Sequence, residues 1–442
     1  MNNLVSELGR ALNFDKTLKY KHDISTWLLP FYTRNPERVK FTEGFGAIVG
    51  VIARQLNGES VEMIQKPFAL TSTSLETTVD TEKVAELFDR SNYQQMQSAK
   101  LLQYQPLSTD QQSKGEIRLG LFLIQLLKLQ DNQDFVNAFK AEQPFNLYEK
   151  ILYESLANSD EHTQGTDMVF TFYDHEWFSK CFSRDIQHFL TNKDYFYQHI
   201  DELLEFYYFT YVIQLISRIS DATEQETIIP LYFTLENEPV SQSRLSIQQG
   251  YQLVYQHGQD LLVDMDVLNY LNALIPADSF YWKSQILDEA FKYRIELMDN
   301  LKQFIEAYRE QVPEGKLDDI EFNYTSLSSA ISTLRMILEK QKGAPDSRYA
   351  KSLDEIAQQG YIRQHGRLGR VFSLSNQTVL MLTAAIVGNH KMLLKDVFNE
   401  LQQRGVYFDR LSRERVIRLF ERVNVLEKLS DSGDAQYVKG IL

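Results

Sequence analysis

Residues 409–439 decide the fold of the C-terminal part of the chain and read DRLSRERVIRLFERVNVLEKLSDSGDAQYVK. Apolar side chains recur on one side of a helix that we predict from Ser412, as its N-cap, to about Asn424. Two short apolar segments, 425–429 and 435–439, flank the sequence Asp-Ser-Gly-Asp, which is typical of tight turns. The stretch therefore predicts a helix followed by a β-hairpin.

The residues before this stretch predict a strand and two further helices. The alternating segment 370–374 is typical of a short strand, and Ser375 stands where the N-cap of an apolar helix ending at Gly388 belongs. A second helix stops at Gly405, because glycine readily adopts the left-handed conformation that ends many helices. A strand, three helices and a hairpin in this order indicate an α+β winged helix-turn-helix domain over residues 361–442.

The rest of the chain has the pattern of a mainly α protein. Amphipathic segments dominate residues 1–345 and predict an acidic, multi-helical body. Polar stretches near 70–81 and 158–167 indicate sub-boundaries within this body. We expect residues 346–360 to form a linker or helix that leads into the C-terminal domain.

Two parts of the body have sharper patterns. Residues 281–311 and 324–342 predict an antiparallel helical hairpin. Residues 227–233 favour a strand, and their proline would place it at the edge of a sheet. The polar loop 236–244 is either a partner contact or an exposed turn with a helix cap at Ser243, and the sequence leaves both open.

Charge separates the C-terminal segment from the body. Residues 361–442 carry 13 Lys and Arg against 8 Asp and Glu, whereas the whole chain has a net charge of −14. Arg415, Arg418 and Arg422 are spaced so that, at roughly 100° per residue, they form one stripe away from the apolar side of the last helix. Such a stripe is able to contact DNA phosphates or guanine edges. A protein-docking surface and a solvated helix face are the alternatives.

Four more arginines join the predicted DNA-binding set. Arg413 belongs to the same helix as the stripe. Arg363, Arg367 and Arg370 lie in a basic, glycine-containing segment, which predicts either a phosphate-contacting arm or a flexible connection.

Composition limits the classes of protein to which the chain belongs. The single cysteine, Cys181, excludes a disulfide framework within the chain and indicates a reducing compartment. No apolar stretch reaches the ~20 residues of a bilayer span, and the N-terminus has no secretory pattern, so we expect a cytoplasmic protein without membrane contact. The sequence has no phosphate-binding loop, and we therefore expect no nucleotide or other cofactor.

One acidic cluster suggests a different function. Asp174, His175 and Glu176, with Asp185 nearby, are residue types that hold divalent metal ions in nucleases. The zinc-protease spacing is absent, however, and aromatic residues around the cluster are typical of a helix that packs inward. A metal-dependent nuclease is therefore the alternative function, and a purely structural scaffold is another.

Two stretches of the chain are similar to one protein family. They are residues 419–438, LFERVNVLEKLSDSGDAQYV, and residues 231–233, LYF, leading to 240–244, VSQSR. With these stretches, its length and its acidic helical body, the chain resembles the DptG family, also called DndG. That family is the middle-sized subunit of bacterial DNA phosphorothioation-dependent restriction systems.

The resemblance implies a role in antiviral DNA restriction. It implies a DptF-like ATPase and a DptH-like helicase or translocase as partners, which together restrict DNA that lacks the backbone sulfur modification of the host. The chain would then be a non-catalytic adaptor with local DNA contact. No catalytic residue follows from the resemblance.

Overall fold

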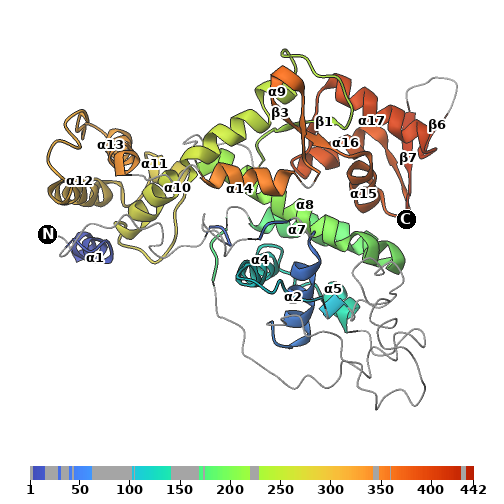
Figure 1. The fold of residues 1–442 in the computed structure, drawn as a ribbon, viewed down its shortest axis with the longest axis horizontal. Coiled ribbons are helices and arrows are strands. Elements are labelled where there is room, and N and C mark those ends of the chain that lie inside the picture. Colours follow the sequence, from blue (N-terminus) through green and yellow to red (C-terminus); the bar gives the residue numbers. More distant parts are fainter. Residues whose placement is uncertain are drawn as a thin grey trace. The chain divides into compact units, whose positions relative to one another are not determined.

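The structure, a computed structural model, is mainly helical with a small mixed sheet (Figure 1). It describes residues 3–14, 28–30, 39–41, 44–61, 102–103, 105–140, 169–172, 175–219, 228–341, 348–358, 360–429 and 435–442. The predicted sub-boundaries at 70–81 and 158–167 lie outside the described residues, as does the turn at 431–434. None of the described helices is long and apolar enough to cross a membrane.

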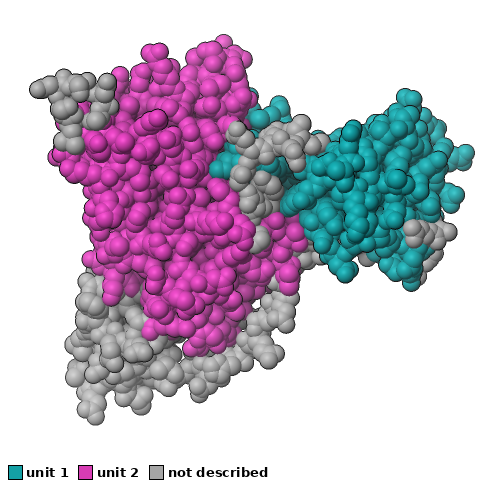
Figure 2. Space-filling view, turned by 180° about the vertical axis from the view of Figure 1, so that it is seen from behind, with its two compact units in different colours: residues 1–27, 212–229, 252–354 teal, residues 28–211, 230–251, 355–442 magenta. Residues whose placement is uncertain are grey.

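The chain forms two compact units whose segments alternate along the sequence (Figure 2). The first unit contains residues 1–27, 212–229 and 252–354, and the second contains 28–211, 230–251 and 355–442. Three helices, α8 (Lys193–Ile219), α10 (Tyr251–Ala273) and α14 (Arg348–Ala357), each include a boundary between the units. The segment 346–360, predicted as a linker or helix, thus contains α14. That residues 361–442 fold as a separate domain stays a prediction.

The first unit is built from helices. Its described elements are α1 (Asn3–Ala11), the end of α8, α10 (Tyr251–Ala273, apart from its first residue), α11 (Lys283–Leu287), α12 (Arg294–Gln311), α13 (Leu327–Gln341) and most of α14. Both α1 and α13 pack on α12. The helix predicted over 281–311 is therefore two helices, since the chain turns between α11 and α12.

The second unit begins with helices. They are α2 (Gly46–Asn57), α4 (Gln112–Leu126), α5 (Gln133–Phe139), α7 (His175–Leu190) and most of α8. The backbones of α2 and α4 approach closely at Gly120, where a Cβ atom would lie 2.5 Å from Cγ1 of Val51. Glycine at this position therefore permits the close packing of the two helices.

The C-terminal part of the second unit contains the predicted helices together with more strands than predicted. The elements are β2 (Ile362–Gln364), the 3-10 helix η3 (Gly366–Leu368), β3 (Arg370–Leu374), α15 (Asn376–Val387), β4 (Lys391–Leu393), α16 (Leu394–Gln403), β5 (Tyr407–Phe408), α17 (Arg410–Arg422), β6 (Leu426–Leu429) and β7 (Ala435–Lys439). Ser375 caps α15 by accepting the amide of Thr378, as predicted, and Gly405 (φ 79°) follows α16.

A strand from outside the C-terminal segment completes its sheet. This strand is β1 (Tyr232–Leu235), followed by the short helix α9 (Leu245–Gln248). It lies between β3 and β5, parallel to both, in a sheet with the order β2-β3-β1-β5. The prediction of an edge strand was therefore wrong. Pro230 precedes the strand, so it removes no hydrogen bond from the interior of the sheet.

Aromatic side chains form the core between α8 and this sheet. Phe209 of α8 stacks on Tyr361 with ring centroids 4.2 Å apart, and Phe233 of β1 stacks on Phe372 of β3 at 5.1 Å. Each of these rings is buried. The second sheet has the order β4-β7-β6 and is antiparallel throughout.

Candidate nucleic-acid interface

Helix α17 carries the predicted arginine stripe and begins at a different cap from the predicted one. Asp409 is the N-cap, and its carboxylate accepts the backbone amide of Ser412 at 3.1 Å. Ser412, which we predicted as the cap, is buried in the first turn and donates its hydroxyl to Glu238. Aspartate is as good a cap as serine, and local sequence alone does not choose between them.

The buried side of α17 faces the two sheets. Ser412, Val416, Leu419 and Phe420 are buried, and the helix packs on β1, β5 and β6. These residues recur at steps of three and four, as expected for one side of a helix. The orientation of α17 about its own axis is therefore fixed by packing.

The opposite side of α17 presents Arg415, Arg418 and Arg422 to solvent. All three are exposed, and none of their side chains has a hydrogen bond or ion pair to a residue that the structure describes. The two acidic residues of α17 bind other cations instead, Glu414 contacting Arg410 at 3.3 Å and Glu421 contacting Lys428 at 3.0 Å. Three guanidinium groups thus share one stripe without a neutralising carboxylate in the described structure.

Two other arginines of the predicted set make internal contacts. Arg413 donates its Nε to the carbonyl of Phe408 at 3.1 Å, and its guanidinium lies 5.3 Å from the ring centroid of Phe398. Arg370 is half-buried and donates to the hydroxyl of Tyr251 at 3.4 Å. These contacts reduce the freedom of both side chains to reach a ligand.

The remaining two arginines of the predicted set, Arg363 and Arg367, are exposed at or near strand β2 of the four-stranded sheet. Arg363 lies on β2, the edge strand, and Arg367 lies in η3, which connects β2 to β3. Neither side chain has a hydrogen bond or ion pair to a described residue. Helix α17, in contrast, follows β5 at the other edge. The structure therefore places Arg363 on one edge strand of this sheet, whereas α17 packs on β1 and on β5, the other edge strand.

The acidic residues considered for a nuclease do not form a described metal site. Asp174 and the side chain of His175 lie outside the described residues. Glu176 is exposed and contacts Lys128 at 2.7 Å, whereas Asp185 is fully buried against Arg404. Within the described part of the chain, no group of three or more His, Cys, Asp and Glu side chains is placed to hold a metal ion.

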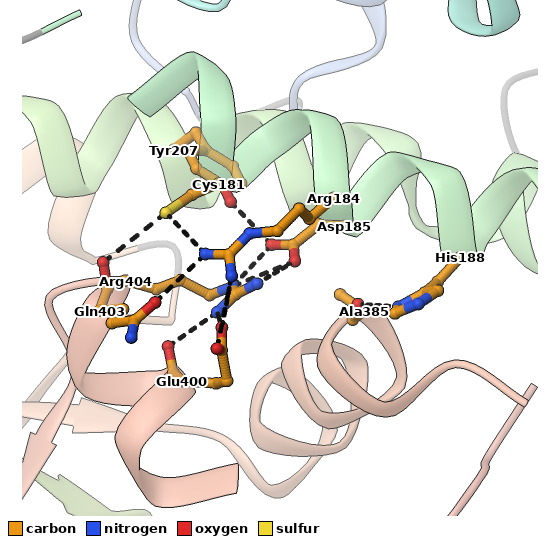
Figure 3. A network of polar contacts seen from close by, with 9 residues as sticks. All are labelled: Cys181, Arg184, Asp185, His188, Tyr207, Ala385, Glu400, Gln403 and Arg404. Carbon is orange, nitrogen blue, oxygen red and sulfur yellow. Dashed lines mark hydrogen bonds and ion pairs between the residues drawn. The ribbon is translucent and has the colours of Figure 1, made fainter. Parts of the chain in front are cut away.

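A buried ion pair fixes the end of α16 on α7 (Figure 3). The guanidinium of Arg404, only 2% exposed, donates through Nε and Nη2 to both carboxylate oxygens of Asp185, with Nε 2.8 Å from Oδ2. Nη1 binds Glu400 at 2.6 Å, and the hydroxyl of Tyr207 donates to Asp185 at 2.7 Å. Arg404 is therefore a structural arginine, despite its place in the basic segment.

A second buried arginine, Arg244, binds the first turn of α17. Its side chain contacts Asp409, Glu238 and Ser412. The sequence contained one weak sign of this site, a polar loop ending in Arg244, but the pairing joins residues 165 positions apart. Periodicity and turn signals describe only local structure, so they did not reveal either buried arginine site.

No protein-family model matches the chain, and no curated protein is significantly similar to it.

Proposed function

We propose that this protein contacts DNA through α17 and acts as a non-catalytic adaptor subunit of a DNA restriction complex. The DNA contact is inferred from the arrangement of charged side chains. The restriction complex, with its DptF-like ATPase and DptH-like helicase partners, is inferred from the resemblance to the DptG family. The two inferences are tested separately, since the first concerns one helix and the second concerns partners.

The order of elements supports a winged helix-turn-helix at the C-terminus. Helix α15, strand β4, helix α16, the short strand β5, helix α17 and the β6–β7 hairpin follow one another, and β7 lies between β4 and β6. In DNA-binding proteins with a helix-turn-helix, the second helix of the pair enters the major groove. In this arrangement α17 takes that place.

The single observation that carries the proposal is the unneutralised arginine stripe. Arg415, Arg418 and Arg422 lie on the solvent side of α17, while the acidic residues of the helix pair with other cations. Arginine binds phosphate oxygens and guanine edges through several N–H donors. A net charge of −14 opposes binding of a polyanion by the whole surface, so we expect any DNA binding to depend on a local contact of this kind.

Binding of a short duplex by a triple variant tests the contact. We expect Arg415→Ala, Arg418→Ala and Arg422→Ala together to weaken binding at low salt by at least about tenfold, because up to three phosphate contacts are lost. The matched control replaces three exposed lysines of the first unit, Lys292, Lys302 and Lys316, by alanine, which changes the net charge equally. Equal binding by the two triple variants would contradict the proposal and favour a docking or scaffold role.

Co-purification tests the partner inference independently. We expect the full chain, expressed with the products of its neighbouring genes, to be recovered with an ATPase and a helicase-like protein. Recovery of the chain alone would contradict the adaptor role and leave the DNA contact to be judged by itself.

A further inference from the structure

The first turn of α17 is held by a buried arginine from the loop after β1. Arg244 is only 7% exposed, which is rare for arginine unless it is paired. Its Nε and Nη2 donate to the two carboxylate oxygens of Asp409 at 2.5 and 2.7 Å. Nη2 also donates to Glu238 at 2.6 Å and to the hydroxyl of Ser412 at 2.9 Å.

Glu238 extends this network to the end of β1. Its carboxylate accepts the backbone amide of Leu235, the last residue of the strand, at 3.0 Å. It also accepts the hydroxyl of Ser412 at 3.0 Å. Asp409, on the other side of Arg244, is the N-cap of α17. One guanidinium and two carboxylates therefore join the start of α17 to the end of a strand that is distant in sequence.

The geometry of the network restricts the direction of the helix as well as its position. A bidentate arginine–carboxylate pair fixes the planes of both groups relative to each other. Burial by itself would raise the pKa of Asp409, but the hydrogen bonds from Arg244 and from the backbone of Ser412 outweigh it, so the pKa lies below its ordinary value. Asp409 is thus a carboxylate at neutral pH, as the pairing requires.

We propose that Arg244 is a positioning residue for DNA binding: it fixes α17 on the end of β1, so that the stripe of Arg415, Arg418 and Arg422 faces DNA in one orientation before binding. This proposal rests on the proposed function, because it assigns to Arg244 the preorganisation of that same contact. A helix held in advance loses less conformational freedom on binding.

Hydrogen exchange of the full chain without DNA tests the positioning. In Arg244→Met we expect amides at the start of α17 to exchange at least about tenfold faster, while those of α4 stay unchanged. Asp409→Asn is the second variant, since asparagine keeps the helix cap but loses the charged pair. Arg335→Met is the matched control, because Arg335 binds Asp264 and Asp260 in the first unit. Equal acceleration in α4 and α17, or none in α17, would overturn the proposal.

Duplex binding over a range of salt concentrations supplies the functional readout. If Arg244 positions the stripe, Arg244→Met weakens binding by about fivefold or more and shifts the salt slope toward that of the triple stripe variant. Adding Arg244→Met to the triple variant then causes little further loss. If Arg244 only stabilises the fold, Arg244→Met lowers the fraction of folded protein but leaves the dissociation constant and the salt slope of the folded protein unchanged. That result would overturn the proposal.

Hydrogen exchange and duplex binding together distinguish a failure of the proposed function from a failure of the positioning role of Arg244. Wild-type protein that binds no duplex contradicts the proposed function, and the exchange data then decide alone whether Arg244 fixes α17. Wild-type protein that binds duplex, together with an unchanged slope in Arg244→Met, contradicts the positioning role and leaves the proposed function standing.

Discussion

The buried arginine on the inner side of the C-terminal segment forms ion pairs, whereas the arginine stripe on its solvent-exposed, outer side does not pair with described carboxylates. On the inner side, Arg404 is 2% exposed and binds Asp185 of α7. On the outer side, Arg415, Arg418 and Arg422 are exposed and have no carboxylate partner among the described residues. The net positive charge of the segment is therefore a poor guide to function, and the positions of the carboxylates decide which arginines are available to a ligand.

The largest expected effect concerns the inner side. Arg404→Met leaves Asp185 buried without its partner, and we expect a loss of about 3–5 kcal/mol in the free energy of unfolding. Arg184→Ala is the control, because Arg184 is half-exposed where it contacts Glu400, and its loss should cost less than about 1 kcal/mol. Chemical denaturation followed by circular dichroism measures both.

The double variant Arg404→Met, Asp185→Asn sharpens this result. It removes both buried charges, so we expect it to be less destabilised than Arg404→Met alone. If Arg404→Met costs less than about 1 kcal/mol, the ion pair does not hold α16 on α7, and the contrast between the two sides fails.

A second prediction examines inner packing that does not depend on charge. Gly388, just after α15, has φ 58°, and a Cβ atom there would lie 2.7 Å from Cδ2 of His188. We expect Gly388→Ala to cost more than about 2 kcal/mol, through backbone strain and overlap with the ring. Gly366→Ala also has a positive φ (51°) but nothing within 4 Å, so it should cost about 1 kcal/mol. Equal thermal midpoints for the two variants would contradict this packing.

A third prediction concerns an acidic group on α8. Burial, with the negative charges of Asp201 and Glu202, raises the pKa of Glu205 to about 8. A glutamate in the unfolded chain titrates near about 4.3, so the folded protein holds this proton more tightly. The stabilisation is complete below pH ~4 and is lost as the pH rises through about 8. The free energy of unfolding should therefore fall across this window.

Glu205→Gln removes this titration. At pH 8.5 we expect the variant to be more stable than wild type by on the order of 1–2 kcal/mol, with a weaker decline between pH 5 and 8. Some decline should remain near pH 6, because burial and Glu202 raise the pKa of Asp201 to about 6. Glu314→Gln, at an exposed position, is the control. An identical pH profile for wild type and Glu205→Gln would contradict the raised pKa, because it would mean that the carboxyl group of Glu205 is hydrated in the folded protein.

The smallest effect on stability is expected from the outer side. Replacing Arg415, Arg418 and Arg422 together by alanine should change the free energy of unfolding by no more than about 0.5 kcal/mol, because these exposed side chains have no hydrogen bond or ion pair to another described residue. Thermal denaturation of the triple variant beside wild type measures this. A loss comparable with that of Arg404→Met would mean that the stripe is structural.

Local signals predicted much of the C-terminal segment. Ser375 as a cap, Gly405 after α16 and the β6–β7 hairpin each depend on a few neighbouring residues, and the structure contains all three. The place of β1 was not predictable in this way. Its register pairs Thr234 with Ser373, and such a long-range parallel contact leaves no periodic mark in either strand.

The sequence predicted only part of the candidate site, because local patterns do not reveal contacts between residues that are distant in sequence. Helical spacing placed Arg415, Arg418 and Arg422 on one side of a helix, and the structure exposes all three. Spacing did not reveal that Arg413 stacks on Phe398, nor that Arg244 reaches Asp409. These contacts depend on tertiary packing, which residue type and periodicity do not encode.

The most direct test of the central claim is the salt dependence of duplex binding by wild type and by the triple variant of Arg415, Arg418 and Arg422. For B-form DNA, the slope of log affinity against log salt is about −0.9 for each phosphate neutralised. We predict that the slope of the triple variant is smaller in magnitude than that of wild type by up to about 2.7, with no change in the control variant of Lys292, Lys302 and Lys316. Equal slopes for wild type and the triple variant would contradict the account.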